Sequence, residues 1–285
     1  MKRSTKIKII VFFIVFFLCF VDLRPLFMPK KSPIVTTPTI DETRKSYNNG
    51  SCYDMTNDLC YLIIYLDDTE SNWNESEKNN FMEKKFLVSL DYLSRKASDY
   101  SVTLSTKYTI YPDNNTSVRF NGIIESDVVE NGRQEDILNN LAISMGYSSP
   151  EEMDSSLKDN LGVSQLAYLL VANKNGRSYK YSYVTTESRT IEFCVFFDDA
   201  ITYYRDTCNP TVAHEILHLF GAEDYYDPYG KMPEREKLAK ELYPNDIMLT
   251  LPKDVNDAEI GPYTAYCLGW TNTLPKECNV DNWWK

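Results

Sequence analysis

Residues 211–226 of this 285-residue chain read TVAHEILHLFGAEDYY, and this stretch guides the interpretation of the rest. His214 and His218 are four positions apart, and Glu215 directly follows the first of them. Residues four apart share one face of a helix, so both imidazoles can bind a single Zn²⁺. Glu215 lies one step around the helix, where it can accept a proton from water without being a ligand itself. These two histidines are the only ones in the chain, which argues against a chance arrangement.

The residues after His218 extend this pattern. Gly221 comes three positions later, where helices often end in a left-handed turn that glycine adopts readily. The chain can then fold back and offer Asp224 as a third ligand. Two histidines and one carboxylate leave the fourth position on zinc open, as catalytic sites require.

Composition restricts the class of protein. Hydrophobic residues make up 43% of the chain and charged residues 25%, which is typical of a globular protein. The formal net charge of −11 argues against nucleic acid as a partner, because phosphate binding requires a Lys/Arg surface. The length suffices for one large domain or two small ones, and we expect a monomer.

The N-terminus resembles a targeting segment. Basic residues precede an unbroken apolar run from Ile9 to Val21. This run is shorter than the roughly 20 residues that cross a bilayer, and it fits the core of a signal peptide. No small-x-small cleavage pattern follows, so residues 1–21 are a signal peptide, an N-terminal membrane anchor or, least in keeping with the pattern, a buried helix. The first two readings place the protein outside the cell, either secreted or on the extracellular face of the membrane.

Residues 22–50 are expected to form a flexible spacer, because this proline-rich stretch has too little apolar surface to order itself. The folded domain is expected over residues 51–285. Six cysteines follow the targeting segment, and an even number in an exported chain predicts disulfides. Their spacing favours the pairs Cys52–Cys60, Cys194–Cys208 and Cys267–Cys278. Fifteen pairings remain open, and buried free thiols are the alternative.

Apolar periodicity predicts a mixed α+β fold. Strands are expected at 61–66, 102–111, 166–171, 179–184 and 190–197, and helices at 81–100, at 135–145, from Pro150 and after Asn209-Pro210. The early strand–helix–strand order indicates a mixed sheet with packed helices.

The extended pattern H-E-x-x-H-x-x-G-x-x-D resembles the zinc motif of the metzincin metallopeptidases, in the variant where Asp replaces the third His, as in snapalysin-type enzymes. Metzincins also have a tight turn with a Met beneath the metal, and Met248 in the segment DIMLT resembles that residue. The resemblance implies an α+β fold with a five-stranded twisted sheet and the zinc helix at a cleft. It also implies an upper subdomain over 51–221 and a lower one over 222–285, which contains the Met-turn and a terminal helix at 257–268.

The same resemblance implies an extracellular zinc endopeptidase. One catalytic Zn²⁺ is held by His214, His218 and Asp224, Glu215 activates water, and the substrate is a peptide or protein. In the family an antiparallel edge strand binds the substrate backbone, and our candidate is 179–184, with Tyr179, Tyr181 and Tyr183. Several metzincins have a Tyr two residues after the Met. Here that place is Thr250, and Tyr225, Tyr226 and Tyr263 are candidates to replace it.

Three alternatives remain open at this stage. A downstream glutamate can serve as the third ligand, and the candidates are Glu234, Glu236 and Glu241. The protein can also be a cell-surface binding module whose zinc is structural. The acidic clusters at 67–68, 198–199 and 254–259 suggest calcium, but no EF-hand spacing supports it, and a solvated acidic surface is the simpler explanation.

Overall fold

The computed structural model describes residues 50–113, 116–126, 133–184, 190–198, 208–226 and 233–278. All of them belong to one compact unit, Thr39–Lys285. The predicted targeting segment 1–21 and nearly all of the predicted spacer 22–50 lie outside these residues. In the part that is described, no helix has the length and apolarity that a membrane crossing needs.

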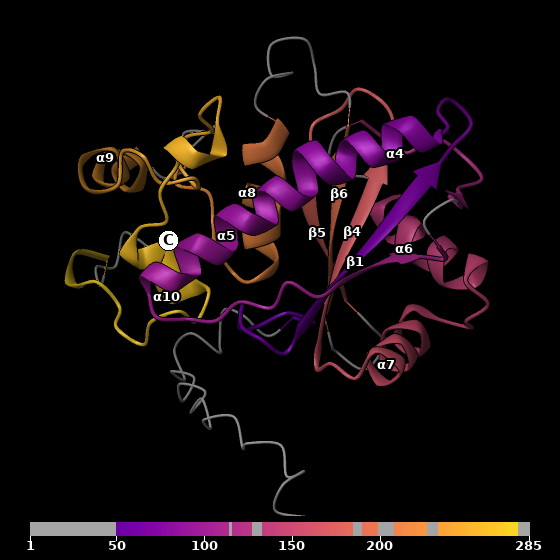
Figure 1. Ribbon diagram of the computed structural model, residues 1–285, viewed down its shortest axis with the longest axis horizontal. Coiled ribbons are helices and arrows are strands. Elements are labelled where there is room, and N and C mark those ends of the chain that lie inside the picture. The colour runs from indigo at the N-terminus through magenta and orange to yellow at the C-terminus, as the bar shows by residue number, and fades with distance from the viewer. Residues whose placement is uncertain are drawn as a thin grey trace, which may run out of the picture. The chain divides into compact units, whose positions relative to one another are not determined.

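A mixed sheet forms the centre of the fold (Figure 1). Its strand order is β2-β1-β4-β6-β5, and the short strand β3 also pairs with β1. The bounds are β1 Leu59–Asp67, β2 Tyr108–Tyr111, β3 Val118–Arg119, β4 Gln165–Ala172, β5 Tyr179–Val184 and β6 Thr190–Phe197. All neighbours are parallel except β5 and β6. All five predicted strands have a counterpart, although the strand predicted at 102–111 is formed only at 108–111. Within the described residues, sequence analysis missed β3 alone.

The central strands are buried on both faces, as their continuous apolar runs predict. Side chains alternate between the faces, so Tyr61 and Ile63 of β1 enter one core while Leu62 and Ile64 enter the other. The first core includes residues of α5 (Leu87–Asp99) and α8 (Cys208–Leu219), so we call that side of the sheet the α8 face. The second includes residues of α6 (Arg133–Ser144) and α7 (Pro150–Leu161), and we call that side the α6 face.

The long predicted helix at 81–100 begins earlier than expected. It consists of α4 (Glu75–Phe81), a π-helical turn (Met82–Phe86) and α5 (Leu87–Asp99), which run in front of the sheet in Figure 1. Asn74 starts it with a capping box, because its side chain accepts from the Glu77 amide while the Glu77 carboxylate accepts from the Asn74 amide. The spacing of Asn74 and Glu77 indicates this helix start in the sequence, and sequence analysis missed it.

On the α6 face lie α6 (Arg133–Ser144) and α7 (Pro150–Leu161). Helix α7 begins at Pro150 as predicted, with Ser149 as its N-cap, and ends at Gly162 in the left-handed conformation. The remaining elements are α8 (Cys208–Leu219), α9 (Pro233–Leu242), the 3₁₀ turns Val255–Asp257 and Lys276–Cys278, and α10 (Pro262–Cys267). The terminal helix predicted at 257–268 is thus shorter, because α10 begins only at Pro262, which occupies its first turn.

The predicted disulfides are wrong for the cysteines that the structure describes. Cys52, Cys60, Cys194, Cys267 and Cys278 are buried free thiols. Cys52 packs in the core of the α8 face and Cys60 in that of the α6 face, so the sheet separates them. The Cys194 thiol donates to the Glu215 carbonyl oxygen, while the side chain of its predicted partner Cys208 lies outside the description. Closeness in sequence did not indicate on which face each thiol lies.

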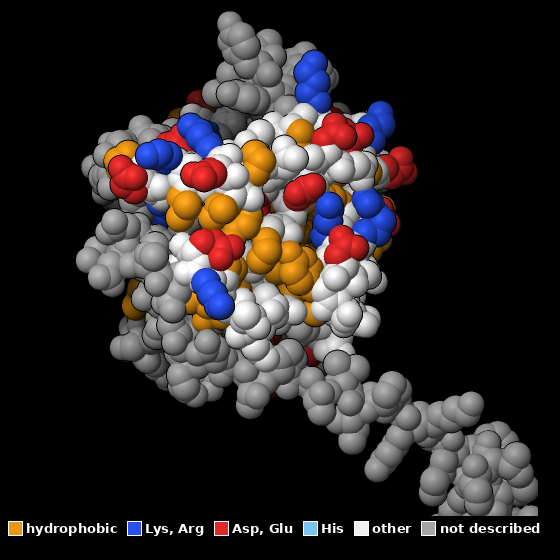
Figure 2. Space-filling model, turned by 90° about the vertical axis from the view of Figure 1, so that its left-hand side faces the viewer, with side chains coloured by type: hydrophobic (Ala, Val, Ile, Leu, Met, Phe, Trp, Pro, Cys, Tyr) orange, Lys and Arg blue, Asp and Glu red, His pale blue; other side chains and the backbone are white. Residues whose placement is uncertain are grey.

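The core of the α8 face extends from the sheet into the C-terminal residues, where Ile247, Met248, Ala265 and Trp270 belong to it. Figure 2 shows the side of the molecule on which α9 lies, with apolar side chains gathered between charged ones. Leu238, Leu242, Leu249, Leu251 and Leu274 are among the partly exposed apolar residues of this C-terminal part. The division into subdomains at 221 and 222 stays a prediction.

Candidate metal centre

Helix α8 carries the two histidines because its apolar residues fix it against the sheet and α5. Val212, Ala213, Ile216 and Leu217 are all buried in the core of the α8 face. His214 is also buried, while His218, four residues on, is partly exposed. Gly221 ends the helical segment with a φ of 88°, as predicted for a left-handed turn. The chain then reverses direction towards Asp224.

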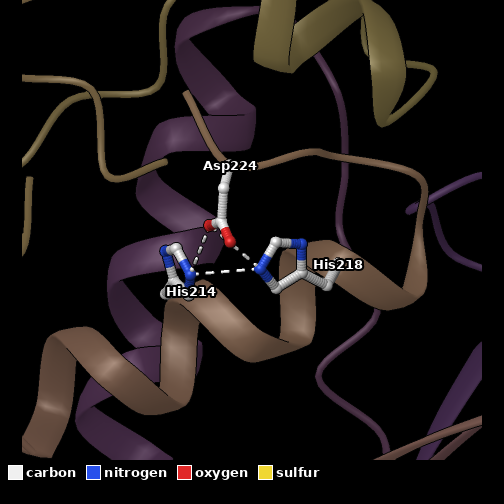
Figure 3. A group of neighbouring side chains, drawn as sticks. All are labelled: His214, His218 and Asp224. Atoms are coloured by element: carbon white, nitrogen blue, oxygen red, sulfur yellow. Dashed lines mark hydrogen bonds and ion pairs between the residues drawn. The ribbon is translucent and has the colours of Figure 1, made fainter. Parts of the chain in front are cut away.

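The structure brings His214, His218 and Asp224 together (Figure 3). Their ligand atoms all lie within 4.8 Å of one another. Oδ1 of Asp224 is 3.0 Å from Nε2 of His214 and 3.3 Å from Nε2 of His218, and the two Nε2 atoms are 3.1 Å apart. Two imidazole nitrogens and one carboxylate oxygen are ligands that zinc prefers in catalytic sites. The donor set therefore fits a single Zn²⁺.

Both histidines are oriented by backbone carbonyl groups. Nδ1 of His214 lies 3.0 Å from the oxygen of Ile247, and Nδ1 of His218 lies 2.7 Å from the oxygen of Ala222. A carbonyl only accepts, so each Nδ1 carries the proton and each Nε2 keeps its lone pair for a metal. The outer contacts therefore select the tautomer that metal binding requires.

Charge also favours a cation among these three side chains. Burial opposes a charged His214, but the hydrogen bond and charge of Asp224 outweigh it and raise the pKa of His214 to about 9. Burial likewise works against a charged Asp224, yet its hydrogen bonds to both histidines hold its pKa well below the usual range. The group thus stabilises a positive charge, which a proton or a metal cation can supply.

Glu215 is buried beside the histidines, with 7% of its surface exposed. Burial raises its pKa above the ordinary value, and the imidazoles of His218 and His214 oppose this rise. A carboxylate whose pKa is shifted upwards is a better proton acceptor near neutral pH than an exposed one. Glu215 is outside the group of converging ligand atoms, and its role as a base stays a prediction.

A tight turn at Asp246–Leu249 carries Met248, which is fully buried. Asp246 holds this turn in place, because its carboxylate accepts from the Met248 amide (2.8 Å), the Gly261 amide (2.7 Å) and the Thr264 hydroxyl (2.9 Å). Burial nevertheless raises the pKa of Asp246 to about 6. Sequence analysis selected Met248 and missed Asp246, two residues earlier, which organises the turn.

The segment that contains Asp224 is fixed from two sides. The amide of Tyr225 donates to the Met248 carbonyl oxygen at 2.8 Å. Arg235 of α9 donates to the Asp224 carbonyl oxygen and forms an ion pair with Glu223 at 2.7 Å. Arg235 is buried. Arginine is seldom buried unless it is paired, and these partners explain its burial. No sequence signal identified Arg235.

Of the three candidate tyrosines, the structure places Tyr226 at the metal centre. Its ring stacks on that of His214, with 6.5 Å between centroids and 19° between planes. Its pKa is raised by burial and by the charge and hydrogen bond of Asp224, while Arg177 opposes the rise. The Tyr225 hydroxyl instead pairs with Thr264, and Tyr263 is buried in the core.

The predicted substrate strand 179–184 is confirmed as an antiparallel edge strand, β5. However, Tyr179, Tyr181 and Tyr183 pack on the α6 face, opposite to α8. Their side chains therefore point away from α8, the helix with the two histidines. Only the backbone of β5 remains a candidate for substrate binding. Tyr179 also lines a cavity of about 230 Å³ between the loop after β3 and α6, and none of the three candidate metal ligands lines it.

The alternative third ligands lie on or near helix α9. Glu234, Glu236 and Glu241 do not belong to the group of converging ligand atoms among the described residues. Glu236 instead pairs with Lys240 of the same helix. This arrangement favours Asp224 as the third ligand.

One acidic residue of each cluster that suggested calcium has a protein partner. Asp68 is bound by Lys174 at 2.6 Å and Asp198 by Lys85 at 2.5 Å. Asp254 accepts from the amide and side chain of Asn256. Asp199 lies outside the described residues. These contacts provide structural reasons for the acidic residues.

A scan against models of known protein families gave no match, and a search of curated proteins gave none either.

Proposed function

We propose that this protein is a zinc-dependent endopeptidase of the metzincin type that acts outside the cell. One observation supports this above all others: two imidazoles with free Nε2 lone pairs and one carboxylate converge on a point beside a buried glutamate. The donor set has three protein ligands rather than four, which is typical of catalytic zinc. The buried Met248, in a turn that contacts the segments of His214 and Asp224, adds to the likeness to metzincins.

The site residues have distinct roles in this proposal. His214, His218 and Asp224 hold the zinc, which supplies a Lewis acid that lowers the pKa of water and polarises a peptide carbonyl. Glu215 accepts a proton from the attacking water and transfers it to the leaving amine nitrogen. Water thus adds across the peptide bond, giving one carboxyl and one amino terminus. In this proposal Tyr226, whose ring stacks on His214, donates a hydrogen bond to the carbonyl oxygen as negative charge develops on it.

The edge strand β5 is the proposed docking site for the substrate backbone. It has β6 on one side only, and α8 packs against it. An extended peptide can add to such an edge through main-chain hydrogen bonds, which bind many different sequences. This favours cleavage within a chain over recognition of a terminus.

The test is cleavage of a mixed peptide library, read by mass spectrometry. We expect Glu215→Ala to lower turnover by a factor of about 10²–10⁴ while zinc stays bound, because the base is lost and the ligands remain. Removal of zinc by a chelator should abolish cleavage, and Glu234→Ala, an exposed carboxylate on α9, should change nothing. A zinc-loaded protein that cleaves no peptide would reject the enzyme and favour a binding module with structural zinc.

A second experiment tests the third ligand. Asp224→Ala should lower the zinc content of the purified protein well below one equivalent, because only two ligands remain. Glu236→Ala should keep zinc, since Glu236 pairs with Lys240 and not with the histidines. The reverse result would assign the third ligand to α9.

A further inference from the structure

Arg177 lies in the short loop between β4 and β5, and its side chain reaches the candidate metal centre. The guanidinium donates a hydrogen bond to the Tyr226 hydroxyl, which in turn donates to the Asp224 carboxylate. Its charge also acts on Glu215, the proposed base. Arg177 is exposed, so a bound peptide can reach it from solvent. A cation from the sheet therefore faces the residues that are proposed to act on a peptide bond.

The loop that carries Arg177 is held on both sides. The Arg177 amide donates to the Ser126 carbonyl oxygen at 2.7 Å, and the Ser178 hydroxyl accepts from the Phe197 amide at 3.3 Å. Gly176 packs so closely on the Phe197 ring that a Cβ atom there would lie 2.4 Å from it. Because the backbone on either side is fixed, the guanidinium is presented from a set position at the beginning of β5.

The basic residues on either side of Arg177 have carboxylate partners. Lys174 pairs with Asp68 at 2.6 Å, and Lys180 of β5 pairs with Glu192 at 2.6 Å. At the metal centre Arg177 instead contacts a tyrosine hydroxyl, which is neutral at physiological pH and does not offset its charge. A guanidinium has five N–H donors in a planar fork, so it can bond to this hydroxyl and still bind both oxygens of a substrate carboxylate.

The position of Arg177 relates the proposed docking edge to the metal centre. Strand β5 begins at Tyr179, directly after this loop, and α8 packs against the strand (Figure 1). A peptide that pairs with β5 and presents a carbonyl group to the candidate zinc ligands has the side chains next to that carbonyl near Arg177. An extended chain advances about 3.3 Å per residue, so only residues close to the scissile bond lie within reach of the guanidinium.

We propose that Arg177 selects peptide substrates with a carboxylate next to the scissile bond, supplied by an acidic side chain. This inference rests on the proposed function and names its substrate class. Two parallel hydrogen bonds from a guanidinium to a carboxylate fix direction as well as charge, which a lysine does not reproduce. The formal net charge of −11 otherwise disfavours acidic peptides, so their recognition depends on this local cation.

The first test measures binding rather than cleavage. The zinc-loaded Glu215→Ala protein is titrated with fluorescent peptides in which a single Glu or Gln is moved along an otherwise neutral sequence, and fluorescence anisotropy gives the affinity. Both ends are blocked, so the Glu side chain is the only carboxylate. At one position we expect Glu to bind about 10-fold more tightly than Gln, as a charge-assisted hydrogen bond predicts. Equal affinities at every position, or no binding of any peptide, would overturn the proposal.

Three further variants, made in the Glu215→Ala protein, identify the group that is responsible. Arg177→Gln should abolish the difference between the Glu and Gln peptides, and Arg177→Lys should keep only part of it, because the charge remains without the planar fork. Arg95→Gln changes an exposed arginine of α5 that pairs with Asp91, and it should keep the whole difference. Zinc content should be the same in all of them. A preference for Glu that survives Arg177→Gln would assign recognition to another residue.

Cleavage by the protein with Glu215 intact separates recognition from a general structural role. The readout is the ratio of kcat/KM for the Glu peptide to that for the Gln peptide, which should fall from about 10 towards 1 in Arg177→Gln. A merely structural role would lower both values by the same factor and leave the ratio unchanged. Cleavage without any preference for Glu would reject this inference and keep the peptidase. Binding of the Glu peptide through Arg177 without any cleavage would reject the peptidase instead.

A free C-terminal carboxylate offers the same chemistry as an acidic side chain. Neutral peptides with a free or an amidated C-terminus therefore form a separate arm of the binding test. We expect the two forms to bind equally, because the edge strand favours positions within a chain. A preference for the free terminus that Arg177→Gln removes would assign Arg177 to the end of the peptide and overturn the proposal of an acidic side chain.

Discussion

Nδ1 of His214 lies 3.0 Å from the carbonyl oxygen of Ile247, the residue directly before Met248. The turn in the C-terminal part of the chain therefore orients a proposed metal ligand on α8, 33 positions earlier. In the same turn, the Met248 carbonyl oxygen accepts a hydrogen bond from the Tyr225 amide and so fixes the residue next to Asp224. Two of the three proposed ligands are positioned by one turn, and the first prediction follows from this coupling.

Asp246→Ala should destabilise the protein and weaken zinc binding together. It leaves the Met248 and Gly261 amides and the Thr264 hydroxyl without their acceptor, and a buried unsatisfied donor costs about 1–3 kcal/mol. We expect the free energy of unfolding to fall by about 3 kcal/mol, measured by urea denaturation. Asp254→Ala, an exposed Asp that accepts within its own short turn, is the matched control. Equal effects of the two changes would contradict this role of Asp246.

Arg235→Met should lower zinc affinity although Arg235 is not a ligand. It removes the donor to the Asp224 carbonyl oxygen and the partner of Glu223, so the segment with the third ligand loses its support from α9. Loss of such outer contacts weakens metal binding by about 10–100-fold. Competition with a chelating dye measures this, and Lys237→Met, an exposed change on the same helix, serves as control. Unchanged affinity would show that Asp224 is held in place without Arg235.

Tyr226→Phe should slow turnover while zinc remains bound. The ring keeps its stacking on His214, but the hydroxyl beside Asp224 and Arg177 is lost. We expect kcat to fall by about 10–100-fold, less than the loss caused by removing a main oxyanion donor. Tyr225→Phe is the matched control, because its hydroxyl pairs with Thr264 and should affect stability rather than kcat. If Tyr226→Phe retains full activity, the hydroxyl has no part in the reaction.

Asp68 should make stability depend on pH in the acid range. Its side chain is fully buried, and although burial opposes its charge, Lys174 and the amides of Ile124, Glu70 and Ser71 lower its pKa to about 2. A folded-state pKa below the unfolded value contributes stability above about pH 4, and this is lost as pH falls towards 2. At about 1.4 kcal/mol per unit the contribution is about 2 kcal/mol at neutral pH.

The comparison of wild type with Asp68→Asn isolates this effect, since the other carboxylates titrate in both proteins. Urea denaturation at pH 7 and at pH 2.5 should show a difference of about 2 kcal/mol that shrinks at the lower pH. Asp91→Asn, in an exposed pair with Arg95, should show almost none. A difference independent of pH would mean that the charge of Asp68 does not stabilise the fold.

The sequence by itself determined much of the local structure. The period of the apolar residues placed five strands and most helices, because alternation and helical spacing are properties of neighbouring residues. The spacing of His214 and His218 put both imidazoles on one side of α8, and Gly221 placed the reversal after it. The prediction of Asp224 as a third ligand followed from that reversal. The structure brings His214, His218 and Asp224 together.

Only the tertiary structure decided what holds these residues in place. Ile247 contacts His214, Arg235 contacts Asp224, and Asp246 holds the turn that contains Met248; no local pattern of the sequence shows any of these contacts. The same limit explains the failure of the disulfide prediction, because spacing along the chain does not show that a sheet separates Cys52 from Cys60. The contact between Glu192 and Gly50 likewise joins residues 142 positions apart, and it exists only because the chain has folded.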